Sequence, residues 1–257
     1  MEVVRLCNKY EVKVIEDCAH SFLTKVNDQP TGSFGHIAIY SMRKTLAIAD
    51  GGGLKINIDS AFPDDTTGRR TESYYQDIYY LLQRFLEFLL VKIIHINICS
   101  KKFASFRNGF AFFFSSKKIT EREKGIVSFC GPSNSLITYL NSDDYLEEIM
   151  TKRRDNFMAL SEKFQGTEVD AFFKKLPKGC VPQGFIIKDK SGMLCDSLRS
   201  KGVGAAKWPD DTIPIFVKEN PDLFPIAHKL NRTLVMLPLH QDLPLNQINY
   251  LSKVLIV

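Results

Sequence analysis

The stretch that decides the fold runs from Val12 to Asn57, reading VKVIEDCAHS from Val12 and GSFGHIAIYSMRKTLAIADGGGLKIN from Gly32. Val12–Ile15 is short, apolar and rich in β-branched residues, which predicts a buried strand of a parallel sheet. Ile37–Tyr40 predicts a second such strand. Gly53–Asn57 predicts a third strand after a glycine turn. The pattern of short strands indicates an α/β sheet.

Polar side chains follow the first two predicted strands where each strand ends. Asp17 follows the first strand, with His20 three residues later, and Ser41 and Lys44 follow the second. Open α/β sheets bind ligands at the carboxyl ends of their strands. We therefore expect a carboxylate and an amine to meet at one edge of the sheet.

That pair of groups suits pyridoxal phosphate (PLP), which needs a carboxylate beside its ring nitrogen and a lysine to form a Schiff base with its aldehyde. Asp17 and Lys44 are the candidates for these two roles. Ser41 is placed to donate a hydrogen bond to the phosphate, and His20 to contact the ring. The residues alone leave two other interpretations open: Asp17 as a helix cap, and Lys44 as a solvated surface lysine.

The order of these motifs resembles the DegT-type (DegT/DnrJ/StrS) sugar aminotransferases, which belong to the fold-type I PLP-dependent enzymes. The family carries a strand ending in Glu-Asp-x-Ala-His/Gln, matched here by residues 16–20. It then carries Gly-x-x-Gly-Asp-Ile, a strand with a serine, the lysine and an acid-Gly-Gly turn. Residues 32–37, Ser41, Lys44 and residues 50–52 match these in order. The resemblance implies that Asp17 contacts the pyridine nitrogen and Lys44 carries the cofactor.

Two positions depart from the family pattern. Many members place the lysine five residues after the serine, whereas Lys44 comes three residues after Ser41, as in a subgroup that reads Arg-Lys-Thr-Leu. The neighbouring Arg43 cannot replace Lys44, because a guanidinium stays protonated and forms no imine. His36 stands where an aspartate is usual, and we interpret it as structural.

The resemblance implies fold type I, with a partial large domain built on a mainly parallel sheet and a small C-terminal α/β domain. We expect residues 1–144 to be the remainder of the large domain, with a helical insertion at about 60–130. Residues 145–257 then hold a linking helix, Tyr145–Phe164, and the small domain. Family members have a phosphate-binding loop and a stacking ring upstream of this point. The chain therefore resembles the latter two-thirds of such an enzyme, and alone it is expected to bind PLP weakly and turn over little.

Residues 78–98 have the length of a membrane span but contain Arg84, Glu87 and Lys92. With His95, these residues fall on one side of a helix, which predicts an amphipathic helix. Three interpretations stay open: packing on the protein itself or a dimer partner, lying on a membrane surface, and spanning the membrane. The phenylalanine-rich segment 99–130 is left unassigned.

Composition excludes several function classes. The 257 residues carry a net charge of +5, and their basic residues are scattered in short pairs, so nucleic-acid binding is not expected. The six cysteines form no Cys-x-x-Cys pair, which argues against a zinc site. Without a secretory signal, reduced thiols in the cytoplasm are the simpler interpretation.

The expected activity, by resemblance, is transfer of an amino group from an amino acid donor to a keto sugar, often nucleotide-linked, by a homodimer. His240, in the segment LPLHQDL, is the candidate substrate-binding residue, with a structural loop histidine as the alternative. The rival interpretations are a catalytically silent remnant that keeps the fold and a membrane-surface protein.

Overall fold

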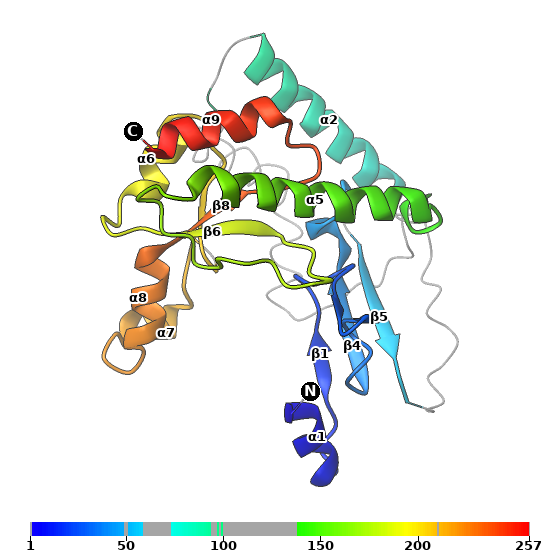
Figure 1. Ribbon diagram of the computed structural model, residues 1–257. Coiled ribbons are helices and arrows are strands. Elements are labelled where there is room, and N and C mark those ends of the chain that lie inside the picture. Colours follow the sequence, from blue (N-terminus) through cyan, green and yellow to red (C-terminus); the bar gives the residue numbers. More distant parts are fainter. Residues whose placement is uncertain are drawn as a thin grey trace. The chain divides into compact units, whose positions relative to one another are not determined.

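The computed structural model describes residues 2–48, 51–58, 73–93, 97, 99, 138–209 and 211–256 (Figure 1). The chain divides into two compact units. The first unit comprises Met1–Leu86, Lys124–Lys152 and Pro177–Gln183, and the second comprises Glu87–Glu123, Arg153–Leu176 and Gly184–Val257. Most of the predicted insertion at about 60–130 lies outside the described residues.

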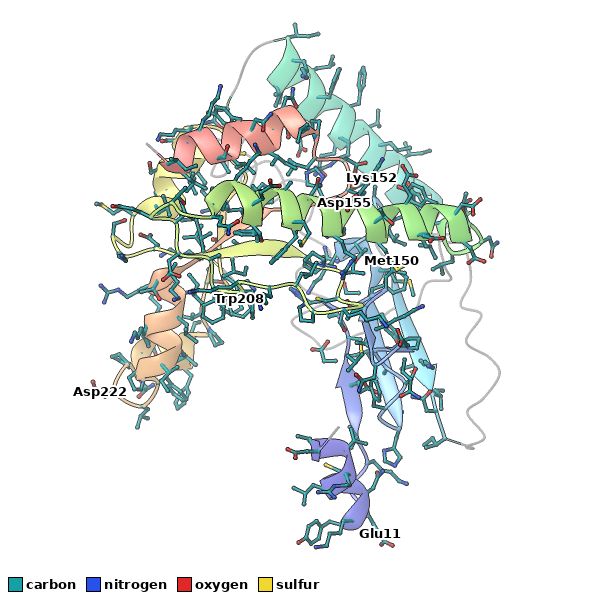
Figure 2. The ribbon with its side chains drawn as sticks, in the orientation of Figure 1. Glu11, Met150, Lys152, Asp155, Trp208 and Asp222 are labelled. Atoms are coloured by element: carbon teal, nitrogen blue, oxygen red, sulfur yellow. The ribbon has the colours of Figure 1, made fainter. Side chains whose placement is uncertain are left out.

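The first unit opens with helix α1 (Glu2–Lys9), which leads through a turn at Glu11 to strand β1 (Ile15–Asp17). Figure 2 labels Glu11 at the foot of α1. Strand β1 pairs in parallel with β4 (Ile37–Ser41), and β4 pairs antiparallel with β5 (Gly52–Ile56). The three-stranded sheet therefore has the order β1-β4-β5, and β4 is central (Figure 1).

This sheet corrects two expectations. The first strand begins at Ile15 rather than Val12, and Ile15 is 65% exposed rather than buried. The sheet is mixed rather than mainly parallel among the described strands, because β5 runs antiparallel to β4. The reason lies in the connection: a parallel crossover needs a dozen or more residues, and fewer separate Ser41 from Gly52.

A two-stranded hairpin interrupts the path from β1 to β4. Strands β2 (Lys25–Val26) and β3 (Gln29–Pro30) pair across Asn27 and Asp28, whose φ angles are 51° and 64°. Asparagine and aspartate tolerate this left-handed conformation better than most residues, and two-residue hairpin turns require it. The hairpin was not predicted.

A small core supports the segment that follows β4. After a short 3₁₀ turn, η1 (Met42–Lys44), Leu46 and Ile48 pack with Ile149 of helix α5 (Asp143–Phe164). All three are at most 3% exposed. The backbone carrying Lys44 is therefore anchored on one side by buried side chains.

Helix α2 (Ser73–Lys92) begins five residues before the predicted helix and ends six residues before its predicted end. Its residues Leu81, Leu82 and Phe85 are exposed. Among the described residues, no helix has both the length and the apolarity that a membrane crossing requires.

The second unit is built on a three-stranded sheet of order β6-β8-β7. Strands β6 (Gly184–Lys188) and β7 (Ala206–Lys207) both pair antiparallel with the central β8 (Leu234–Pro238). After α5, the described helices of this unit are α6 (Leu194–Ser200), α7 (Ile215–Glu219), α8 (Pro225–Thr233) and α9 (Leu245–Ile256).

The core of the second unit lies between its sheet and helices α5, α6 and α9. Phe157 and Phe164 of α5 pack on Phe185 of β6, with ring centroids 5.0 and 5.6 Å from that of Phe185. Cys195 and Leu251 add buried side chains from α6 and α9. The predicted helix Tyr145–Phe164 is confirmed by α5, which begins two residues earlier and ends at the same residue.

Candidate functional site

The carboxyl ends of β1 and β4 lie together, as the sequence predicted. Asp17, the last residue of β1, pairs with Ile39 of β4, and the amide of Cys18 donates to the Ile39 carbonyl at 2.8 Å. Ser41 ends β4 two residues later. Asp17 and Ser41 therefore occupy neighbouring strand ends at one edge of the sheet, and Lys44 follows within one turn.

Lys44 contacts His20, with 2.6 Å between the Lys44 Nζ atom and the His20 Nε2 atom. The turn that presents Lys44 is fixed by its backbone: the amides of Thr45 and Leu46 both donate to the Met42 carbonyl, and the amide of Met42 donates to the Gly51 carbonyl. The buried Thr45 hydroxyl also accepts a hydrogen bond from Gln183. Lys44 itself is exposed, so a fixed backbone presents a reachable amine.

The charge state of His20 follows from its surroundings. Partial burial lowers the pKa of His20, the Lys44 cation lowers it further, and Asp17 acts in the opposite direction. A lowered pKa favours the neutral ring, whose Nε2 atom accepts the hydrogen bond from Lys44. The pKa of His20 in the folded protein lies below the usual 6.5. The stability contributed by its neutral contact with Lys44 is therefore present above pH 6.5 and is lost as the pH falls through the folded pKa.

Asp17 makes a local turn contact as well as lying at the sheet edge. Its Oδ1 atom accepts a hydrogen bond from the amide of Ala19 at 3.0 Å, which forms an Asx turn. No helix begins there, so the helix-cap alternative does not describe this residue. Asp17 is exposed, and its carboxylate is accessible to a ligand at the edge of the sheet.

Glu16 is the main residue that the sequence analysis missed. Its carboxylate accepts hydrogen bonds from the amides of Gly32, Phe34 and Gly35, at 2.9, 2.7 and 2.5 Å. Gly32 has a φ of 82°, and a Cβ atom there would overlap the Tyr40 hydroxyl. Gly-Ser-Phe-Gly was the available signal, because two closely spaced glycines allow consecutive amides to point at one anion.

Replacing Glu16 with alanine is expected to release the Gly32–Gly35 loop. Hydrogen bonds to a charged group contribute roughly 1.5–3 kcal/mol each, so amide exchange at Gly32, Phe34 and Gly35 should accelerate at least about tenfold. Hydrogen exchange followed by NMR measures this. Glu2→Ala, an exposed change on α1, is the control and should leave these amides unaffected. Unchanged exchange in the Glu16 variant would remove its anchoring role.

Further contacts hold the same loop and occupy the other lysine of this sheet. The Asn57 amide group donates to the carbonyls of Gly32 and Gly35, and Lys55 donates to the Ser33 hydroxyl at 2.7 Å. Lys55 is therefore engaged in the loop, whereas Lys44 lies beside the strand ends. This difference favours Lys44 as the reactive amine.

His36 has the structural role expected for it. Its Nδ1 atom accepts a hydrogen bond from the amide of Val14 at 3.0 Å, and its own amide donates to the Val14 carbonyl. The imidazole therefore joins the chain segments that precede β1 and β4.

His240 lies in the second unit, in the loop that follows β8. Helix α5 holds this loop by two bonds: Arg153 Nε donates to Gln241 at 3.0 Å, and Asn156 donates to the His240 carbonyl at 3.0 Å. Burial lowers the pKa of Arg153 to about 10, against the favourable charge of Asp242. Partial desolvation likewise lowers the pKa of His240, with Asp242 opposing this and Arg153 reinforcing it.

The polar side-chain groups at the edge of the first sheet fit PLP better than they fit a metal ion. They comprise an amine, an imidazole, a hydroxyl and a carboxylate, from Lys44, His20, Ser41 and Asp17. Within the described residues, no three His, Cys, Asp or Glu side chains form a metal-binding group. A lysine for a carbonyl group and an acid for a pyridine nitrogen are the protein groups that PLP requires.

Comparison with known proteins agrees with this chemistry. Residues 1–62 match the family model of the DegT/DnrJ/EryC1/StrS aminotransferases. Over 82 residues the chain is 32% identical to a UDP-N-acetyl-3-dehydro-alpha-D-glucosamine 3-aminotransferase of Acidithiobacillus ferrooxidans. That match covers 30% of this chain and 22% of the relative.

Solved structures extend the likeness to nearly the whole chain. A DegT/DnrJ/EryC1/StrS aminotransferase from Brucella abortus superposes with a TM-score of 0.58 and 15% identity, covering 98% of this chain and 58% of the other. Spr1654 of Streptococcus pneumoniae, in its PLP form, gives 0.58 and 14%, covering 95% and 57%. The chain thus spans less than two-thirds of each of these proteins. Residues 1–62 are thus similar to the DegT/DnrJ/EryC1/StrS aminotransferases, and the fold of the chain is that of solved aminotransferases of this family, which is fold type I.

Proposed function

We propose that the protein is a PLP-dependent aminotransferase and that this chain supplies Lys44 as the lysine that bonds to the cofactor. The observation that carries the proposal is the contact of Lys44 with His20 beside the ends of β1 and β4. The match of residues 1–62 to the family model supports it, because this segment contains every candidate residue of the first unit.

The proposed roles follow from the chemistry of each side chain. When bound, PLP supplies an electron sink for the substrate carbon. Asp17 holds a proton at the ring nitrogen, and Ser41 donates a hydrogen bond to the phosphate. Lys44 binds the cofactor aldehyde and, once released from it, carries a proton to and from the substrate carbon. His20, neutral and in contact with Lys44, orients the amine toward the sheet edge.

The proposed substrate is a keto sugar linked to a nucleotide, with an amino acid as donor. Support comes from the relative that matches over 82 residues, whose name describes amination of a UDP-linked 3-dehydro sugar. We further propose a homodimer, as the family resemblance implies. The exposed apolar residues Leu81, Leu82 and Phe85 of α2 offer a surface consistent with a second copy. The proposed substrate-binding residue of the second unit is His240.

Titration of the 257-residue chain with PLP tests the proposal. PLP joined to a protein lysine absorbs near the violet–blue boundary, so a band there should grow as PLP is added. Because the chain alone is expected to bind PLP weakly, the band should approach one equivalent per chain only at high PLP concentration. Dialysis against buffer with hydroxylamine, which captures the aldehyde, should abolish the band. A lysine-free peptide is the blank and should give no band. If the chain also gives no band at any PLP concentration, the chain is a silent remnant and the proposal is wrong.

A further inference from the structure

A small cavity lies in the second unit, away from the residues assigned above. Its volume is about 270 Å³, and it is lined by the loop from β6 to α6 and by one face of α8. The loop contributes Asp189 and Lys190, and the helix contributes His228, Lys229 and Arg232. Arg232 follows His228 by four positions and Lys229 by three, so all three side chains lie on one face of the helix.

The cavity lies at the end of the sheet opposite the His240 loop. Strands β6 and β8 are antiparallel, with Lys188 paired to Leu234 and Gly184 paired to Pro238. Asp189 and Thr233 line the cavity and adjoin the Lys188–Leu234 end. His240 follows the Gly184–Pro238 end. The cavity is therefore not part of the proposed substrate site of this unit.

Among the described residues that line the cavity, Asp189 supplies the one carboxylate, and its oxygens already accept hydrogen bonds from the loop. Asp189 is 4% exposed and accepts hydrogen bonds from the Ser191 amide and hydroxyl and from the amides of Gly192 and Leu194, all at 2.7–2.9 Å. Four donors occupy its lone pairs. Asp189 therefore fixes the loop and has little capacity left to pair with a lysine or arginine.

Cations dominate the rest of the wall. Lys190, Lys229 and Arg232 are exposed and line the cavity. Asp170 takes a hydrogen bond from Lys188 at 2.8 Å, and Lys188 lowers the pKa of that carboxyl more than Lys190 does. His228 binds the Val217 carbonyl through Nε2 at 2.8 Å. The wall therefore presents three positive charges against one negative charge that is satisfied within the loop.

We propose that this cavity binds a small phosphate-bearing anion, such as phosphate or diphosphate. Its volume falls just below the roughly 300–1,000 Å³ of pockets for drug-sized ligands, so a diphosphate suits it better than a whole nucleotide sugar. Arg232 supplies a planar fork that matches phosphate oxygens, and the two lysines supply point charges. Attraction to three cations offsets the cost of removing water from the anion. Asp189 competes little for these cations, because its oxygens already accept four hydrogen bonds within the loop.

Isothermal titration of the full chain with inorganic pyrophosphate tests the proposal. One equivalent should bind, and Arg232→Gln and Lys229→Gln should each weaken binding at least about tenfold, because each removes a charge-assisted hydrogen bond. Lys253→Gln is the matched control: it removes the same charge from α9 in the same unit, outside the cavity. It should leave the affinity within about twofold.

Two results would overturn the proposal. One is the absence of saturable pyrophosphate binding at millimolar concentration in low salt, where electrostatic attraction is strongest. The other is an equal loss in Lys253→Gln and Arg232→Gln, which would indicate attraction to net charge rather than a site. Binding of PLP measured on the same Arg232 variant should be unchanged, so failure here is distinguishable from failure of the proposed aminotransferase site.

Discussion

Lys44→Ala is expected to lower the affinity of the chain for PLP by at least about 100-fold and to remove the violet absorption band. The covalent bond to the cofactor needs an amine, and the Lys44 amine lies at the sheet edge in contact with His20. A loss of two powers of ten corresponds to about 2.8 kcal/mol. Equilibrium dialysis against PLP, with absorbance recorded on the same samples, measures both quantities.

Lys55→Ala is the matched control for this prediction. Lys55 also belongs to the first unit but donates to Ser33, in the Gly32–Gly35 loop that Glu16 holds. Its removal should leave the band and the affinity within about threefold. A band that survives in Lys44→Ala and disappears in Lys55→Ala would move the cofactor lysine to β5.

Asp17→Asn is expected to weaken PLP binding by about ten- to hundredfold while leaving the fold intact. The structural contact of Asp17 is the hydrogen bond that Oδ1 accepts from Ala19, and an asparagine side-chain oxygen accepts the same bond. What the change removes is the negative charge, which holds a proton on the ring nitrogen through a bond worth roughly 1.5–3 kcal/mol. Affinity is measured by dialysis, and folding by circular dichroism during heating.

The two measurements separate the interpretations of Asp17. A residue with only a turn role would show unchanged PLP affinity in Asp17→Asn, together with a loss of stability in Asp17→Ala of about 1 kcal/mol. The proposed ring contact requires the opposite outcome for Asp17→Asn: lower affinity at unchanged stability. Because Asp17 is exposed, neither variant should prevent folding.

Much of the first unit could be predicted from residue types and spacing. Strand ends bearing Asp17 and Ser41 meet because parallel strands end at the same edge, and the β-branched run at Ile37 fixes β4. The start of β1 was wrong because the run from Val12 is apolar and β-branched without being paired: pairing with β4 begins at Ile15. The residue types indicate which segment favours a strand, whereas the extent of the neighbouring strand β4 decides at which residue pairing starts.

Other features escaped the sequence analysis for identifiable physical reasons. The role of Glu16 depends on amides brought together from Gly32, Phe34 and Gly35, sixteen or more positions away, so no local pattern around Glu16 announces it. The direction of β5 was predictable in principle from the short connection after Ser41. The bond from Arg153 to Gln241 joins residues 88 positions apart, and it is visible only once the chain is folded.

The cavity beside α8 illustrates the same limit. Lys190, Lys229 and Arg232 lie in two separate segments, where each is an ordinary surface residue by sequence. Pairing of β6 with β8 joins the two segments, since Asp189 immediately follows β6 and Thr233 immediately precedes β8. The charge cluster is therefore a consequence of strand register rather than of composition.

The most direct test of the central claim is to locate the lysine that bonds to PLP. The 257-residue chain is mixed with PLP, reduced with borohydride to fix the bond, digested and mapped by mass spectrometry. We expect one dominant adduct, on Lys44, with the Lys44→Ala variant showing none at that peptide. A dominant adduct on Lys55 or Lys13, or labelling spread evenly over the exposed lysines, would contradict the assignment of this site.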